Sequence, residues 1–182
     1  TLTFKGTSSN GDSTASISNV AFTTSPLLVP SSAIIYAPPA LTNTSFETDW
    51  TGWSSRGNNY AYNPTGPGVG WSFVGNAGVT KHGYGLDSSY SVNGQDQGSG
   101  DAPPEGNWEA FLQSGYGPNG SMSQTVSGFV AGQSYDIALF AKARNDGGRS
   151  AVSPNFSNGF QGRPAYDLNY RYGFRSSITV SM

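Results

Sequence analysis

Apolar and polar residues alternate in short runs along this chain, which is the pattern of half-buried β-strands. At the N-terminus, residues 1–22 predict two strands around a turn at residues 8–12. No run has the length and the 3.6-residue period of an amphipathic helix. We therefore expect an all-β chain whose clearest further strands lie at residues 109–113, 121–126, 135–143 and 177–182.

Residues 23–41 break this pattern. Their four prolines exclude the interior of a regular sheet, but their aliphatic side chains are too apolar for a solvated linker. Such a segment must pack on something, either its own domain or a neighbouring molecule. A polar, glycine-rich stretch at residues 82–107 predicts one or two long loops, and residues 145–165 form a polar, glycine-rich insertion with no predicted strand. Trp71 and Phe73 predict an alternating strand with one face in the core.

Composition agrees with a compact β-protein that carries few charges. Of the 182 residues only 11% are charged, 13% are aromatic, and 25 are glycine. The polar positions are filled by Ser, Thr, Asn and Gly, which favour strands and turns. The aromatic content argues against disorder, because disordered chains cannot bury enough apolar surface. The length suits one domain, so we expect an antiparallel β-sandwich with loops clustered at its ends.

Charge and cysteine content exclude several kinds of partner. A formal net charge of −2 predicts no broad cationic surface for nucleic acid, and the absence of cysteine excludes disulfides and thiolate metal sites. No apolar run reaches transmembrane length, so we predict no membrane insertion. Residues 87–109 carry five acids and no base, whereas residues 142–175 carry six bases and two acids. These are either two solvated loop regions or the attracting head and tail of an assembly.

Several short motifs occur in an order that resembles a known family. They are NTSFE at residues 43–47, GWSF at 70–73, AFLQ at 110–113, SMSQTV at 121–126 and GQSY at 132–135. Together they resemble galactose-binding-like jelly-roll modules, the non-catalytic β-sandwiches of bacterial extracellular proteins. The resemblance covers roughly residues 43–145, and it implies that residues 43–47 form the opening strand of the sandwich.

The same resemblance places two strands out of order. TLTFKG at residues 1–6 and ISNV at 17–20 resemble the closing strands, which in the family come at the C-terminal end. We therefore divide the chain into a closing-strand segment (1–24), an apolar Pro-rich linker (25–41) and a galactose-binding-like sandwich (42–182). Three arrangements are compatible with this order. The closing strands fold back on their own chain as a permuted jelly roll, they complete a neighbouring chain, or the sequence is a slice of a tandem array.

The resemblance implies a non-catalytic carbohydrate-binding or adhesive module, extracellular or at the cell surface, with a polysaccharide or glycan as its partner. The alternative is a structural subunit of a fibre or surface assembly. Such a subunit would self-associate through residues 1–40 and polymerise by strand exchange, because an incomplete sheet exposes unpaired edges.

The residues themselves argue against an enzyme. His82 is the only histidine, so it is the only residue that could serve as the histidine of a Ser-His-Asp triad, and a metal site with several histidines is excluded. The acid pairs Glu47/Asp49 and Glu105/Glu109 have the chemistry to flank a glycosidic bond, but Glu47 falls in the expected opening strand, where a structural role fits better. We predict no catalysis.

Aromatic and polar side chains cluster where sugar binding would need them. Sugars are held by flat aromatic faces, while amide, carboxylate and guanidinium groups bond their hydroxyls. The competing role for the two tryptophans of this cluster is to cap one end of the core. The candidate ligand-binding residues are Trp50, Trp53, Arg56, Asn58, Tyr60 and Trp108.

Many modules of the family that this chain resembles hold one structural calcium ion through carboxylate and carbonyl oxygens. The resemblance therefore implies a calcium ion here, with Glu47, Asp49 and Asp136 as candidate ligands. The alternative is a sandwich without metal.

Overall fold

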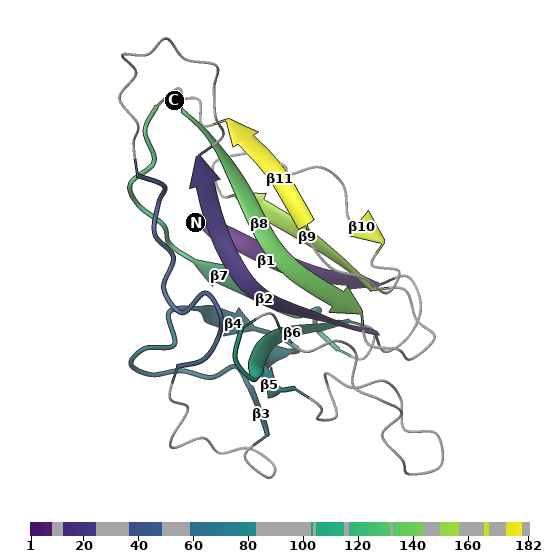
Figure 1. The fold of residues 1–182 in the computed structure, drawn as a ribbon. Coiled ribbons are helices and arrows are strands. Elements are labelled where there is room, and N and C mark those ends of the chain that lie inside the picture. The colour runs from purple at the N-terminus through teal and green to yellow at the C-terminus, as the bar shows by residue number, and fades with distance from the viewer. Residues whose placement is uncertain are drawn as a thin grey trace.

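The strands form two antiparallel sheets that face each other across one core (Figure 1). The computed structural model describes residues 1–8, 13–24, 37–48, 59–82, 103, 105–114, 117–131, 133–143, 150–156, 166–167 and 174–179. Its strands are β1 (Leu2–Ser8), β2 (Ser13–Thr24), β3 (Tyr60–Tyr62), β4 (Ser72–Val74), β5 (Ala77–Lys81), β6 (Trp108–Ser114), β7 (Ser121–Gln124), β8 (Ser134–Ala143), β9 (Ser150–Phe156), β10 (Tyr166–Asp167) and β11 (Phe174–Thr179). The predicted all-β sandwich is confirmed.

The two N-terminal strands are divided between the sheets. Within the described residues, one sheet has the strand order β10-β9-β1-β7-β4, and we call it the β1 sheet. The other has the order β11-β8-β2-β6-β5-β3, and we call it the β2 sheet. Among these residues no helix has the length and apolar character needed to cross a membrane.

Residues 1–24 lie inside both sheets and not at their edges. β1 pairs with β7 on one side and along all seven of its residues with β9 on the other, from Leu2↔Phe156 to Ser8↔Ser150. β2 pairs with β6 and β8. In this structure both strands therefore pair with strands of their own chain.

Two sequence predictions are wrong in this structure. Residues 145–165 were expected to contain no strand, but they contain β9, which is hydrogen-bonded to β1. Residues 43–47 were expected to open the sandwich as a strand, but they form a turn in which Asn43 and Phe46 have φ values of 48° and 63°. We call this segment, with its flanking residues, the 42–48 turn.

Smaller differences concern strand ends. β7 stops at Gln124, two residues earlier than the alternation predicts, and the last described strand is Phe174–Thr179 instead of residues 177–182. The strands predicted at 109–113 and 135–143 are confirmed as β6 and β8. These two segments have the cleanest alternation of apolar and polar residues.

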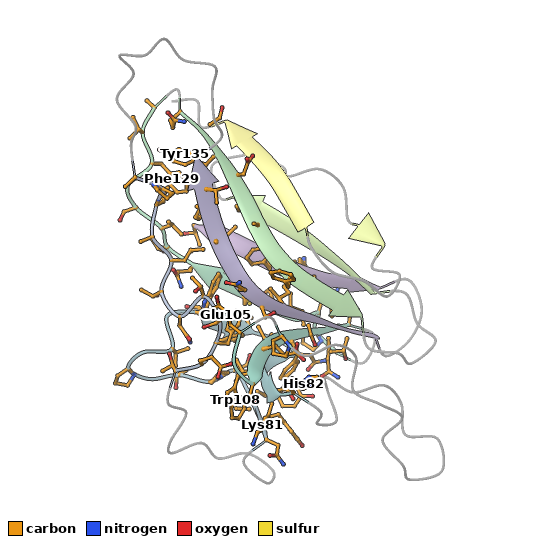
Figure 2. The ribbon with its side chains drawn as sticks, viewed as in Figure 1. Lys81, His82, Glu105, Trp108, Phe129 and Tyr135 are labelled. Carbon is orange, nitrogen blue, oxygen red and sulfur yellow. The ribbon has the colours of Figure 1, made fainter. Side chains whose placement is uncertain are left out.

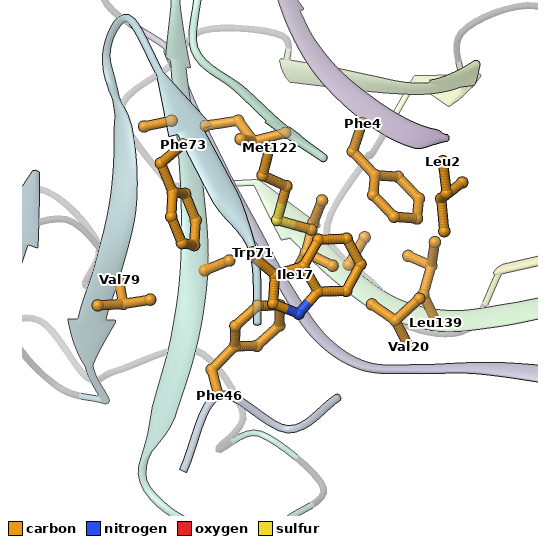
Figure 3. Packing of buried hydrophobic residues seen from close by; sticks show 14 of the residues in the cluster. Leu2, Phe4, Ile17, Val20, Phe46, Trp71, Phe73, Val79, Met122 and Leu139 are labelled. Atoms are coloured by element: carbon orange, nitrogen blue, oxygen red, sulfur yellow. The ribbon is translucent and has the colours of Figure 1, made fainter. Parts of the chain in front are cut away.

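The core lies between the sheets and is centred on Trp71 (Figure 3). This side chain is only 4% exposed, and its ring centroid lies 6.0 Å from that of Phe4 and 5.8 Å from that of Phe46. Met122 and Ile17 are fully buried in the same cluster. The prediction that the Trp71–Phe73 strand turns one face to the core is confirmed, because both side chains are buried.

Side-chain amides fix the 42–48 turn against the core. Gln124 Oε1 accepts a hydrogen bond from Thr42 N at 2.9 Å, and Gln124 Nε2 donates to Thr42 O at 3.0 Å and to Gly70 O at 2.7 Å. Asn43 Nδ2 donates to Val69 O at 3.0 Å. An otherwise irregular segment thereby has its backbone groups satisfied, as buried loops require.

A register shift in β2 meets the same turn. The pairing of β2 with β8 shifts between Ser18 and Ala21, where Asn19 has a φ of 50°. Val20 N is thereby directed to Thr44 O at 3.1 Å instead of to a strand partner. Bulges of this kind re-aim a backbone segment, and here the shift joins β2 to the turn.

Candidate functional site

The candidate site lies on the outward face of the β2 sheet at its β3 edge. Ala61 of β3 faces the core, so Tyr60 and Tyr62 on either side of it point outward. On β6, Ala110 and Leu112 face the core, which places Phe111 on the same outward face as the tyrosines.

Strand register brings these aromatic residues into a row. Tyr62 is paired with Gly78 of β5, and Gly78 is paired with Phe111 of β6. The ring centroids of Tyr62 and Phe111 are 5.0 Å apart, and those of Tyr60 and Tyr62 are 6.0 Å apart. We call Tyr60, Tyr62 and Phe111 the aromatic row.

Gly78 allows the row to close over β5. A Cβ atom at this position would collide with the carbonyl oxygen of Ala61 and would lie 3.0 Å from the ring of Phe111. With no side chain at Gly78, the flanking rings meet across the strand. This contact also has a purely structural value, since an aromatic cross-strand neighbour compensates for a glycine in a sheet.

The three rings of the row differ in exposure, and the middle one is the most exposed. Phe111 is fully buried, Tyr60 is half-buried, and Tyr62 is 45% exposed. Tyr62 is held in place, because its hydroxyl donates to Gln113 Oε1 at 2.6 Å and its ring contacts Phe111 edge-on. A large aromatic surface is thus presented to solvent in a fixed orientation.

Polar side chains border the row on the same face. Gln113 is 9% exposed. Glu109 on β6 and Thr80 on β5 are paired in register, and both are buried. Thr80 Oγ1 lies 3.5 Å from Asn59 O, and Lys81 N donates to Asn59 O at 2.7 Å, so the end of β5 is fixed to the residue that precedes β3.

Trp108 is not part of the row. Along β6 it alternates with Glu109 in the same way as Ala110 and Leu112 do with their neighbours, so it lies on the face that turns to the core. Its half-buried side chain packs against the core. It is paired in register with Lys81, and Figure 2 shows both of them near His82 at the end of the sheet far from Tyr135. Its observed contact therefore agrees with a core-closing role.

Only some of the predicted ligand-binding residues can be placed. Tyr60 lies in the aromatic row and Trp108 at the end of the core. Trp50, Trp53, Arg56 and Asn58 lie outside the described residues, so their role stays a prediction.

Three residues of the site were missed by the sequence analysis: Tyr62, Phe111 and Gln113. Two patterns could have indicated them. Tyr60 and Tyr62 alternate around a small apolar residue, and Phe111 and Gln113 alternate with Ala110 and Leu112. The alternation shows that each pair shares a face, but only the strand register shows that the two pairs meet.

Only two of the three candidate calcium ligands lie in the described residues, so the calcium site stays a prediction. Glu47 lies in the 42–48 turn, Asp136 lies on β8 between Thr23 of β2 and Ser177 of β11, and Asp49 lies outside the described residues. No group of three or more His, Cys, Asp or Glu side chains that could hold a metal ion occurs in this part of the chain.

Glu47 has a hydrogen-bonding role in this structure. Its Oε1 accepts hydrogen bonds from Asn107 N at 2.8 Å and from Trp108 N at 2.6 Å, and so fixes the start of β6. Gly106, with a φ of 71°, makes room for the carboxylate, because a Cβ atom there would collide with it. This arrangement links the 42–48 turn to β6.

Replacing Glu47 by Ala is expected to lower the free energy of unfolding by about 1–2 kcal/mol, because two backbone N–H groups lose their acceptor in a partly solvated place. Glu47→Gln keeps an acceptor oxygen, so it should cost less than about 0.5 kcal/mol. Guanidinium denaturation followed by tryptophan fluorescence measures both. Equal losses in the two variants would contradict the hydrogen-bonding role and favour one that needs the negative charge.

Comparison of the chain with protein-family models, with curated proteins and with solved structures finds no match.

Proposed function

We propose that this protein is a non-catalytic, extracellular or cell-surface module that binds carbohydrate through the aromatic row on the β2 sheet. We also propose that its sandwich is of the galactose-binding-like jelly-roll type, on the strength of the motifs at residues 43–145 and of the two-sheet architecture. The partner is a polysaccharide or glycan, and nucleic acid and membrane lipid are not among the proposed partners.

The observation that carries the proposal is the exposed, fixed ring of Tyr62. A folded protein exposes a large aromatic side chain at some energetic cost, and fixing it in place removes rotamer entropy before any ligand binds. Tyr62 is fixed by Gln113 and Phe111, and Val74 is the only other large hydrophobic side chain that is strongly exposed in the described residues. Such a ring suits the apolar C–H face of a sugar, and the hydroxyl and amide groups beside it suit the sugar's hydroxyls.

Strand exchange is the competing function, and the pairing of β1 and β2 favours carbohydrate binding over it. These strands are central in the two sheets of their own chain. Exchange between molecules would first require both sheets to be opened, which is costly because most of the core contacts would be broken.

Replacing Tyr62 by Ala is expected to weaken glycan binding at least about tenfold, the effect of losing about 1.4 kcal/mol of contact energy. A glycan array with the unmodified protein first identifies a ligand. Affinity electrophoresis or calorimetry with that ligand then measures the variants. Tyr62→Phe retains the ring but loses the bond to Gln113, so we expect a smaller loss.

Val74→Ala is the matched control, because Val74 is 63% exposed but lies on β4 of the opposite sheet. We expect it to bind as the unmodified protein does. Full retention of binding by Tyr62→Ala would exclude the aromatic row as the site, and an array on which no glycan binds would overturn the proposed function itself.

A further inference from the structure

We infer that the ligand is a soluble glycan held through one or two sugar rings, such as a chain end or a short branch, and not the flat face of a crystalline polysaccharide. The inference rests on the proposed function and adds the class of ligand to it. It follows from the angles between the rings of the aromatic row.

Neighbouring rings in the row are close to perpendicular. The planes of Tyr60 and Tyr62 meet at 90°, and those of Tyr62 and Phe111 meet at 82°. A sugar stacks on an aromatic residue face to face, so a flat array of sugars needs several rings in one plane. Two perpendicular rings form a corner, which is complementary to a single ring and not to a plane.

The row cannot easily rearrange into a flat platform. Turning the ring of Tyr62 into the plane of Tyr60 would break its edge contact with Phe111, which is fully buried and therefore has no space to follow. Swinging the whole side chain away would also break the 2.6 Å bond between its hydroxyl and Gln113 Oε1. The perpendicular arrangement is thus fixed before any ligand arrives.

The described residues offer no third exposed ring to extend the row. Phe111 is buried, and Trp108 packs against the core on the other side of β6. Among the residues that the structure describes, the accessible aromatic surface on this part of the sheet is limited to Tyr62 and the half-buried Tyr60. These two rings together offer stacking contact to one or two sugar residues.

The test compares insoluble and soluble carbohydrates on the intact protein. Microcrystalline cellulose and α-chitin are the insoluble probes, with binding measured by depletion from solution. Cello-, xylo-, manno- and chito-oligosaccharides of one to six residues are the soluble probes, together with any ligand from the glycan array. Tyr62→Ala and the Val74→Ala control are measured in parallel.

We expect the protein to stay in solution with both crystalline probes and to bind at least one soluble series. Within that series the affinity should change less than about threefold beyond the disaccharide, and Tyr62→Ala should lose at least about tenfold. Depletion by a crystalline probe that Tyr62→Ala abolishes would overturn the inference while leaving carbohydrate binding in place. Affinity that rises more than about tenfold from disaccharide to hexasaccharide would do the same. Binding to no carbohydrate in either form would instead overturn the proposed function, and the inference with it.

Discussion

Deleting residues 1–24 is expected to abolish the folded state of the protein and not merely an association between molecules. The deletion removes a central strand from each sheet, together with the buried side chains of Leu2, Phe4, Ile17 and Val20. Each such side chain contributes about 1.5–3 kcal/mol when buried, whereas a whole domain is stable by only about 5–15 kcal/mol. The remaining strands would lose more than they can replace.

Circular dichroism and thermal melting measure this effect. We expect the truncated chain to show no cooperative transition, whereas the full chain melts in one. Adding residues 1–24 as a synthetic peptide should restore part of the β-sheet signal, because the missing strands have defined partners in β6–β9. The strand-exchange hypothesis predicts a different result for the full chain. If residues 1–24 completed a neighbouring molecule, the full chain would form oligomers in size-exclusion chromatography, whereas a chain that folds on itself elutes as a monomer.

Replacing Trp71 by Ala is expected to cost about 3–5 kcal/mol of stability, the usual range for truncating a buried large aromatic residue. The substitution leaves a cavity between Phe4 and Phe46, which lie in different parts of the fold. It also removes the hydrogen bond from Trp71 Nε1 to Asn43 O at 3.1 Å, which helps to hold the 42–48 turn. Urea or guanidinium denaturation measures the loss.

The matched variant for this position is Trp71→Phe. It keeps much of the ring but not the donor, so the hydrogen bond alone should account for about 1 kcal/mol of its cost. Any further loss of stability in Trp71→Phe reflects the difference in volume between the Trp and Phe side chains. If the free energy of unfolding of Trp71→Ala were less than about 1 kcal/mol below that of the unmodified protein, the core would not be centred on this side chain.

The strands that the sequence predicts best are those with one face in the core and a clean alternation. β6 and β8 are of this kind. β9 was missed because Ser150–Phe156 lies in a polar, glycine-rich stretch and contains Pro154, a residue that interrupts the interior of a sheet. The topology explains why it is tolerated. β10 pairs only with Val152 and Ala151, so Pro154 lies in a part of β9 that has no described partner on that side.

The 42–48 turn was misread for a different physical reason. A buried aromatic residue among Thr, Ser and Glu suggests a strand, and Phe46 is indeed fully buried. Its backbone, however, has a φ of 63°, which is uncommon for a residue other than glycine. The conformation is held by contacts from distant segments, such as Gln124 with Thr42, and no local pattern encodes these.

The candidate site could be predicted only in part. An aromatic and polar cluster near Tyr60 was visible in the sequence, but its partners on β6 were not. Tyr62 and Phe111 are far apart in the chain, and they meet because both are in register with Gly78. A shift of one residue in either pairing would move them to opposite faces, so the site depends on a register that the sequence pattern alone does not fix.

The central positions of β1 and β2 also determine when the protein can fold during its synthesis. Leu2 pairs with Phe156 and Ala15 with Ala143, so β1 and β2 leave the ribosome long before some of the strands with which they pair. At about 5–20 residues per second, the delay is on the order of ten to thirty seconds. Until β6 and β7 have emerged, the apolar residues of β1 and β2 have no sheet partner, and both sheets stay incomplete until β8 and β9 follow. β1 and β2 are therefore the strands of this fold that most need a chaperone during synthesis.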